Sequence, residues 1–284
     1  MFAIIDIGSN SVRLMLWANG KSLYKRVHTT RLGEGLAASG ELSEPAMERT
    51  TAAVAAYCAE GQAAGAQVYA FATAAVRSAK NGAVFCRRVK ERCGLEVDVV
   101  PGAEEALLGL CGALGDRDGG IIDIGGASTE ICIRERGGIV FSVSLDVGAV
   151  RLFDSCRDDA ARLHERIDRA ILPVEKPLSA GKIYAIGGTA STLASVKLAL
   201  KEYDGEKIQD CPLVFAEVET LSEKLLSLNA EERKQLAGMD KRRADIIAGG
   251  ALLLAKIMKT LSLSVVYSSD KDNLEGYLAL RRLK

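Results

Sequence analysis

The sequence predicts an α/β protein built from two related lobes. Strand-like and helix-like segments alternate along most of the 284 residues, as they do in α/β folds. One short pattern occurs twice: residues 6–11 are D-I-G-S-N-S and residues 123–128 are D-I-G-G-A-S, each between two apolar segments. A repeat at this spacing indicates two lobes rather than a solenoid. The polar, glycine-rich stretch at 116–119 is the predicted boundary, which gives lobes at 1–117 and 118–284.

In the first half, each element follows from a local pattern. The apolar run 2–7 stops at Gly8, and the alternating segment 12–17 predicts the returning strand of a hairpin. An alanine-rich segment at 45–64 predicts a helix that ends near Gly65. Further along we expect strands at 68–73 and 97–100 and helices at 83–93 and 104–112.

The second half opens like the first, with an apolar strand, a glycine turn and a returning strand. We expect strands at 120–124, 129–134, 139–145, 182–186 and 265–268. Helices are expected at 158–171, 189–200, 217–228, 243–261 and about 273–284. The sequence leaves open whether the helix at 273–284 stays with the second lobe or returns to the first.

Composition narrows the function. Lys and Arg together number 37, as do Asp and Glu, so no global charge attracts nucleic acid or an anionic membrane, and we expect neither as a partner. The chain has two histidines and no C-x-x-C pair, which argues against a histidine-rich or zinc-ribbon metal centre. Seven scattered cysteines, no signal-like start and no long apolar segment make the cytoplasm the expected location.

The repeated turn has the chemistry of a phosphate site. Each strand holds an aspartate at its end, the small residues that follow bring backbone N–H groups close to a ligand, and the serine adds a hydroxyl. Asp6 and Asp123 are suited to hold a hydrated Mg²⁺ beside the phosphate oxygens. A third turn, at Gly187, Gly188 and Thr189, lies between a strand and a helix N-terminus, where an anion is also stabilised. No P-loop and no G-x-G-x-x-G pattern is present.

Seven motifs in order resemble the exopolyphosphatase/guanosine pentaphosphate phosphatase family. They lie at residues 4–14, 30–36, 72–81, 101–106, 123–130, 148–152 and 187–193. The resemblance covers residues 2 to about 195 and then weakens. It implies a two-lobed, duplicated fold of the actin/sugar-kinase/Hsp70 type, which is ribonuclease H-like.

The resemblance also implies an activity: Mg²⁺-dependent release of the terminal phosphate of inorganic polyphosphate or of guanosine pentaphosphate. Glu105 matches the general base, and Asp123 and Glu130 match the active-site acids. The residue types alone would also allow the adjacent Glu104 as the base. The matches to phosphate and metal ligands are Asp6, Asn10, Ser11, Arg77, Gly125, Gly126 and Ser128.

Polyphosphate ranks first as the substrate, guanosine pentaphosphate second, and a non-catalytic sensor of polyphosphate or guanosine tetraphosphate third. An actin-fold kinase is a further alternative. A homodimer is the expected assembly, although no motif identifies an interface. Two departures from the family pattern stand out: Ala127 replaces a glycine in the second turn, and no arginine precedes Glu275-Gly276. The basic runs at 87–90 and 241–243 are expected to be solvated faces.

Overall fold

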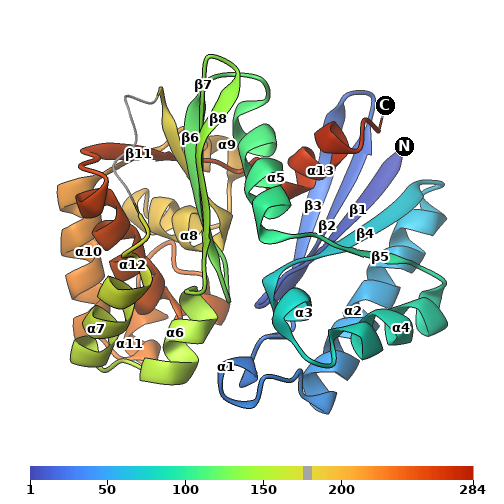
Figure 1. Cartoon of the computed structure of the whole chain (residues 1–284), viewed down its shortest axis with the longest axis horizontal. Coiled ribbons are helices and arrows are strands. Elements are labelled where there is room, and N and C mark those ends of the chain that lie inside the picture. The colour runs from blue at the N-terminus through green and yellow to red at the C-terminus, as the bar shows by residue number, and fades with distance from the viewer. Residues whose placement is uncertain (175–180, 284) are drawn as a thin grey trace.

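Two mixed sheets lie side by side, each with helices on its outer face, in the computed structural model, which describes residues 1–174 and 181–283 (Figure 1). The first sheet has the strand order β3-β2-β1-β4-β5 and the second the order β10-β11-β9-β6-β7-β8. No helix within these residues is long and apolar enough to cross a membrane.

The first sheet is formed by residues from the first third of the chain. Its strands are β1 (Phe2–Ile7), β2 (Ser11–Ala18), β3 (Lys21–Thr29), β4 (Gln67–Ala72) and β5 (Val97–Val99). The helices of this half are α1 (Leu36–Ser39), α2 (Glu44–Ala63), α3 (Ala74–Ser78), α4 (Gly82–Cys93) and α5 (Gly102–Leu114). Helix α2 begins at Ser43, whose hydroxyl accepts from the Ala46 N–H, and Pro45 stands in its first turn. One core joins Ile5, Leu14, Met47 and Phe85, so α2 and α4 cover one face of this sheet.

The second sheet repeats the plan. Its strands are β6 (Gly119–Ile124), β7 (Thr129–Glu135), β8 (Gly138–Leu145), β9 (Ile183–Ile186), β10 (Pro212–Val214) and β11 (Val265–Ser268). The helices are α6 (Ala149–Cys156), α7 (Ala160–Ala170), α8 (Gly187–Lys197), α9 (Gly205–Ile208), α10 (Phe215–Ser227), α11 (Ala230–Arg233), the 3₁₀ turn η1 (Lys241–Arg243), α12 (Ile247–Thr260) and α13 (Asn273–Leu280). Helix α12 is apolar on nearly every side and forms the centre of the larger core.

The two sheets contain the same hairpin. Asp6 in β1 stands opposite Arg13 in β2, and Asp123 in β6 stands opposite Glu130 in β7. In each hairpin the first glycine of the turn donates to the serine that begins or precedes the returning strand: Gly8 to the Ser11 carbonyl and Gly125 to the Ser128 carbonyl, both at 3.0 Å. The repeat predicted from the sequence is therefore a repeat in backbone geometry.

Helices α5 and α13 lie between the sheets and pack on each other (Figure 1). Helix α5 places Leu110 and Leu114 in a core with Ile121 and Tyr184 of the second sheet. Helix α13 places Leu274 and other apolar side chains among those of the first sheet. Each helix thus follows one half of the chain and covers the sheet of the other half.

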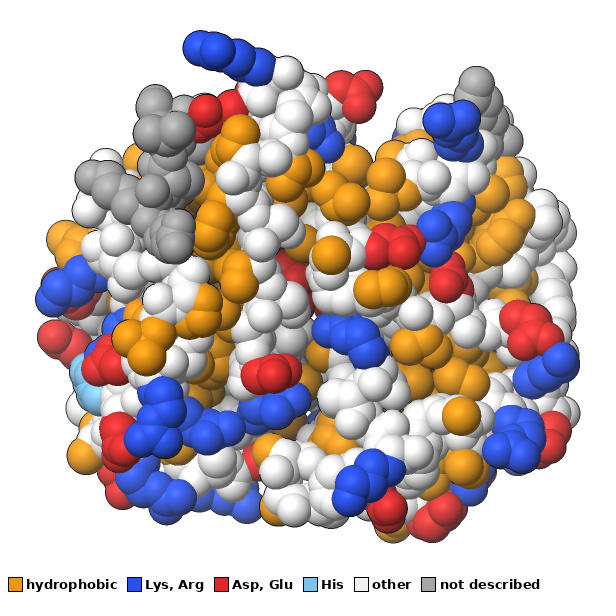
Figure 2. All heavy atoms as spheres, viewed as in Figure 1, with side chains coloured by type: hydrophobic (Ala, Val, Ile, Leu, Met, Phe, Trp, Pro, Cys, Tyr) orange, Lys and Arg blue, Asp and Glu red, His pale blue; other side chains and the backbone are white. Residues whose placement is uncertain are grey.

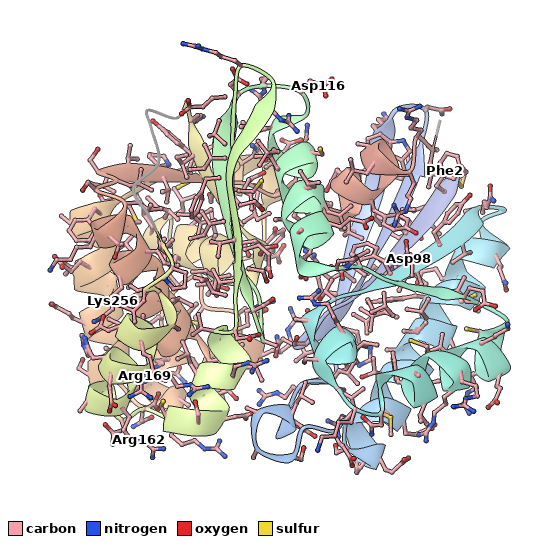
Figure 3. All side chains as sticks on the ribbon, in the orientation of Figure 1. Phe2, Asp98, Asp116, Arg162, Arg169 and Lys256 are labelled. Atoms are coloured by element: carbon pink, nitrogen blue, oxygen red, sulfur yellow. The ribbon has the colours of Figure 1, made fainter. Side chains whose placement is uncertain are left out.

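The C-terminal end of α13 is fixed to the first lobe by polar contacts. The Tyr277 hydroxyl donates to Asp98 of β5 at 3.2 Å, and Arg281 also pairs with Asp98, which is labelled in Figure 3. The Tyr277 ring stacks on Phe71 with centroids 4.7 Å apart. Asp116, also labelled in Figure 3, lies far from these contacts, where α5 gives way to β6.

Most predicted elements are confirmed, and the missed ones share a cause. Strand β3 is an edge strand with largely exposed side chains, so its sequence shows no apolar alternation. Helices α3 and α6 are short, at five and eight residues. Periodicity is weakest in short or solvent-facing segments.

Candidate active site

The two repeated turns meet at the centre of the molecule. A Cβ added to Gly126 would lie 2.8 Å from the Ser9 Cβ and 3.3 Å from the Asn10 nitrogen, so the second turn touches the first. The third turn joins them, because a Cβ on Gly187 would lie 2.6 Å from Oδ1 of Asp123. Gly187 also has a φ of +79°, a left-handed conformation that favours glycine. All three turns predicted to bind phosphate therefore converge.

A cavity of about 1070 Å³ opens between the lobes beside these turns. Arg13 and Lys25 line it from the first lobe, and Gly187, Gly188 and Arg243 line it from the second. In the space-filling view a notch separates the upper parts of the two lobes, with mainly hydrophobic side chains at its base and charged side chains on the face below it (Figure 2). The site is thus an interlobe cleft rather than a surface of either lobe.

Asp6 is held by an arginine from its own hairpin. Nε of Arg13 donates to Oδ2 of Asp6 at 2.9 Å, and a second guanidinium nitrogen also contacts this oxygen. The third nitrogen, NH1, pairs with Asp272. Burial raises the pKa of Asp6, and the neighbouring Arg13 limits that rise. Oδ1 of Asp6 is buried with no hydrogen-bond partner within the described chain.

Asp123 is the equivalent acid of the second lobe and has a weaker partner. The Asn273 side-chain amide donates to its Oδ2 at 3.1 Å. Burial raises the pKa of Asp123 to about 6, although Arg13 lowers it in part. A buried carboxyl with this pKa is partly protonated near neutrality unless a cation binds beside it.

Glu105 points into the site from the first turn of α5. NH1 of Arg77 donates to its Oε2 at 2.7 Å and to the Val100 carbonyl at 2.9 Å. Burial raises the pKa of Glu105 to about 7, and Arg77 opposes the rise. The adjacent Glu104 instead pairs with Arg281 at 2.7 Å and is more exposed. Of the two neighbouring glutamates, only Glu105 lies among the other acids.

Glu130 is almost completely buried on β7. Its Oε1 accepts from the Ser144 hydroxyl at 2.8 Å, while Oε2 is buried with no hydrogen-bond partner among the described residues. Burial raises its pKa well above the usual range, and the negative charges of Glu105 and Asp123 add to the rise. Its surroundings therefore disfavour the ionised form of Glu130 relative to an exposed glutamate.

The remaining predicted ligands are placed as follows. Asn10, Ser11 and Ser128 are buried at the two turns, and both amide atoms of Asn10 have no partner among the described residues. Gly125 and Gly126 form the second turn, and Gly188 lines the cavity. Thr189 differs, because its Oγ1 faces α12, where a Cβ on Gly250 would meet it at 2.8 Å.

Ala127 replaces the glycine without strain. Gly125, Gly126 and Ala127 all lack a positive φ, so the second turn uses no left-handed residue. The glycine needed for close approach is Gly126, which the chain retains. The departure from the family pattern is therefore compatible with the geometry of the turn.

Arg243 is a site residue that the sequence analysis missed. The basic run 241–243 was expected to be a solvated face, and this is wrong for Arg243, whose side chain is only 16% exposed. Its guanidinium covers Gly188 so closely that an added Cβ would lie 1.9 Å from Cζ. The carboxylate paired with it is that of Asp240, 3.9 Å away, which leaves most of its donors free for an anion. No local pattern distinguishes Arg243 from its exposed neighbours.

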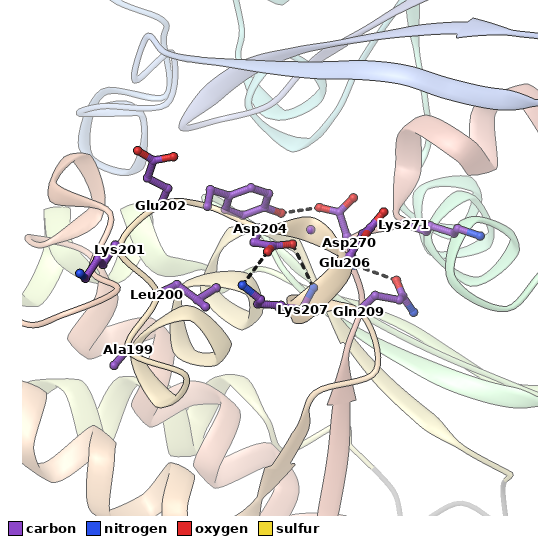
Figure 4. Close-up of a pocket in the computed structure, with 12 residues that line it drawn as sticks. Ala199, Leu200, Lys201, Glu202, Asp204, Glu206, Lys207, Gln209, Asp270 and Lys271 are labelled. Atoms are coloured by element: carbon purple, nitrogen blue, oxygen red, sulfur yellow. Dashed lines mark hydrogen bonds and ion pairs between the residues drawn. The ribbon is translucent and has the colours of Figure 1, made fainter.

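A second cavity, of about 1110 Å³, opens beside the cleft and is shown in Figure 4. The loop at 199–207 lines it together with Gln209, Asp270 and Lys271. Within it Asp204 pairs with Lys207, and Asp270 accepts from the Tyr203 hydroxyl. It contains none of the predicted site residues.

Comparison with known proteins identifies the class of the molecule. A model of the Ppx/GppA phosphatase family matches residues 18–281. Exopolyphosphatase 2 of Mycobacterium tuberculosis is 30% identical over an alignment of 315 positions, which covers 96% of this chain and 96% of that protein. The guanosine-5'-triphosphate,3'-diphosphate pyrophosphatase of Photobacterium profundum is 28% identical, over 93% of this chain and 55% of that protein.

Solved structures agree with these relatives. The crystal structure of an exopolyphosphatase from Cytophaga hutchinsonii superposes with a TM-score of 0.87 at 27% identity, covering 100% of this chain and 98% of that chain. The Aquifex aeolicus member of the Ppx/GppA family gives a TM-score of 0.80 at 29% identity, covering 99% and 97%.

Fold and site together define a two-lobed hydrolase of phosphoric anhydrides. The chain belongs to the Ppx/GppA phosphatase family. The two-lobed, actin-like fold that the motifs implied is confirmed.

Proposed function

We propose that this protein is a Mg²⁺-dependent exopolyphosphatase that releases the terminal phosphate of inorganic polyphosphate, with Glu105 as the general base. The observation that carries the proposal is the environment of Glu105. Its buried carboxylate has a pKa of about 7, is held by Arg77 and lies close enough to Asp123 and Asp6 for their charges to raise that pKa. A base works best when its pKa is close to the pH at which the enzyme operates.

The charges of the cleft fit a divalent cation. Asp6, Asp123 and Asp272 are 3%, 6% and 7% exposed, and one guanidinium, that of Arg13, pairs with two of them. Buried charges that lack a counter-ion are strongly unfavourable, so the surplus carboxylate charge favours either a bound cation or protonation. Among the described residues no group of three or more His, Cys, Asp or Glu side chains forms a metal site. Mg²⁺ does not require such a group, because it commonly takes one or two carboxylates and completes its shell with water and phosphate oxygens.

Asp6 and Asp123 would hold the ion, and the unpartnered Oδ1 of Asp6 is the free oxygen on the first-lobe side. When bound, Mg²⁺ would neutralise phosphate oxygens during phosphoryl transfer. The backbone of the two turns would hold the terminal phosphate, with Asn10, Ser11 and Ser128 as side-chain ligands. Arg77 would contribute its remaining donors to the same phosphate.

The two glutamates take different roles because their pKa values differ. Glu105 is ionised in a large fraction of molecules near pH 7 and can accept a proton from the attacking water. Burial and the neighbouring carboxylates disfavour the ionised form of Glu130, so we assign the role of base to Glu105. Arg77 fixes the orientation of Glu105, which places the base before the substrate arrives.

Guanosine pentaphosphate is the second candidate substrate, and the shape and lining of the cleft are compatible with it. The cavity of about 1070 Å³ is wide for a linear phosphate chain, and Leu200, Leu236 and Met239 line part of it. Apolar walls next to cationic groups suit a nucleoside that carries phosphates. In either case the bond cleaved is a terminal phosphoanhydride.

The test is phosphate release from polyphosphate and from guanosine pentaphosphate, with and without Mg²⁺. Glu105→Gln should lower kcat on the preferred substrate by about 10²- to 10⁴-fold, the usual contribution of a general base. Glu104→Gln is the matched control, since Glu104 pairs with Arg281 outside the acid cluster. Full activity of Glu105→Gln on both substrates would refute its role, and binding without hydrolysis by the wild type would support the sensor alternative.

A further inference from the structure

The N-terminal turn of α13 contacts the predicted acids of both lobes. Asp272 caps this helix: its side chain accepts from the Leu274 N–H, and the Glu275 side chain accepts from the Asp272 N–H at 3.0 Å. The next residue, Asn273, is the first residue of the helix. One tightly capped turn therefore presents Asp272 to the cleft and places Asn273 against Asp123.

Asp272 acts on the first lobe through Arg13. NH1 of Arg13 pairs with Asp272, while Nε and NH2 hold Oδ2 of Asp6. The Arg13 guanidinium is thus fixed from two sides, and its planar fork sets the orientation of the Asp6 carboxylate. Asp272 is 7% exposed, and Arg13 and Lys25 hold its pKa below the usual value despite burial, so it remains ionised.

Asn273 acts on the second lobe directly. Its Nδ2 donates to Oδ2 of Asp123 at 3.1 Å across 150 residues of sequence. The amide leaves Oδ1 of Asp123 unbound, and that oxygen faces the Gly187 turn. A hydrogen bond to one carboxylate oxygen fixes the side-chain rotamer, so the other oxygen points in a defined direction.

The same segment is also anchored to β3. Nζ of Lys25 lies 2.8 Å from Glu275 and donates to the Asp270 carbonyl at 2.5 Å. Because α13 packs on the first sheet while its preceding strand, β11, belongs to the second, this turn spans the junction of the lobes. The turn is therefore a rigid connection between Asp6 and Asp123.

We propose that Asp272 and Asn273 are positioning residues of the hydrolytic site, which hold Asp6, through Arg13, and Asp123 in the geometry needed to share one cation and one phosphate. This inference rests on the proposed function and adds two residues that lie outside the motifs matched by sequence. It also gives Arg13 a role in orienting Asp6.

The test is a double-mutant cycle in kcat. Asp272→Asn keeps a capping oxygen and loses the ion pair, and it should lower kcat by about 10- to 100-fold because small misplacements of reacting groups are costly. KM should change by less than about threefold, since the turns that bind phosphate are untouched. Asp204→Asn is the control: it also replaces a helix N-cap aspartate and loses an ion pair, that with Lys207 at α9, and should retain kcat.

The cycle separates an indirect role from a general structural one. If Asp272 acts through Arg13, the double variant Arg13→Gln/Asp272→Asn should be no slower than Arg13→Gln alone. Asn273→Leu should multiply the loss of Arg13→Gln, because it acts through Asp123. A wild-type kcat in Asp272→Asn or in Asn273→Leu, or multiplying losses for Arg13 and Asp272, would overturn the proposal.

Failure of the proposed function gives a different result. If the wild type hydrolyses neither substrate, thermal unfolding of the same variants still tests the connection. The Tm losses of Arg13→Gln and Asp272→Asn should then be less than additive, because both variants remove the same Arg13–Asp272 ion pair. Additive Tm losses would overturn it.

Discussion

Arg13 and Glu130 occupy the same position in the two halves of the fold. Each stands across its hairpin from the aspartate that ends the preceding strand, Arg13 opposite Asp6 and Glu130 opposite Asp123. The first aspartate therefore has a cation beside it, whereas the second has another carboxyl. This difference gives the second hairpin two facing carboxyl groups where the first has an ion pair, and it makes a site built from a repeated hairpin asymmetric.

The pH dependence of kcat should report on Glu105. Its pKa of about 7 means that kcat should fall as the pH drops below about 7, since protonation removes the base. Arg77 lowers this pKa, so Arg77→Gln should raise it and move the acidic limb to higher pH. A pH series of phosphate release measures the acidic limb of the wild type and that of Arg77→Gln. An acidic limb that moves to lower pH in Arg77→Gln would contradict this assignment.

Contact between the two turns should be sensitive to a single methyl group. In Gly126→Ala the new Cβ would lie 2.8 Å from the Ser9 Cβ, too close without a shift of one lobe against the other. We expect kcat/KM to fall by about tenfold or more, because the phosphate ligands would separate. Gly138→Ala on β8 is the control, as its nearest neighbour is the Glu135 carbonyl at 3.7 Å. Equal activity of the two variants would show that the turns need not touch.

Arg243 should contribute to substrate affinity. Its guanidinium covers Gly188 at the start of α8 and has free donors, so Arg243→Ala should raise KM by about 10- to 100-fold, which corresponds to a charge-assisted hydrogen bond of about 1.5–3 kcal/mol. The exposed Arg87 on α4 serves for comparison, and Arg87→Ala should change KM by less than about threefold. Steady-state kinetics on both substrates measures this. An unchanged KM in Arg243→Ala would exclude the residue from the binding site.

Stability should depend on one fully buried arginine of the second lobe. Arg233 is fully buried, donates to the carbonyls of Leu225 and Ala244 and pairs with Asp158 at 3.0 Å. Arg233→Ala should lower the free energy of unfolding by about 3 kcal/mol, because it removes these bonds and leaves Asp158 unpaired. Urea denaturation measures the change. Lys234→Ala removes only a surface pair with Glu231 and should cost less than about 1 kcal/mol.

Local sequence predicted the parts of the site that are local. The two hairpins, the third glycine turn and the helix that carries Glu105 each follow from strand, turn and helix patterns a few residues long. Arg13 pairs with Asp272 across 259 residues, and Arg243 reaches Gly188 from another element. Such contacts depend on how the lobes pack, which no short pattern encodes.

The crossed placement of α5 and α13 has a consequence for biosynthesis. Ile4, Met15 and Phe71 of the first sheet share a core with Leu274 and Tyr277, which the ribosome adds only after every strand of both sheets has been made. Until then, one side of the earlier sheet lacks the cover that α13 provides. During most of translation the emerging chain therefore exposes an apolar surface that is prone to aggregation. Such surfaces are typically protected by chaperones that bind nascent chains at the ribosomal exit.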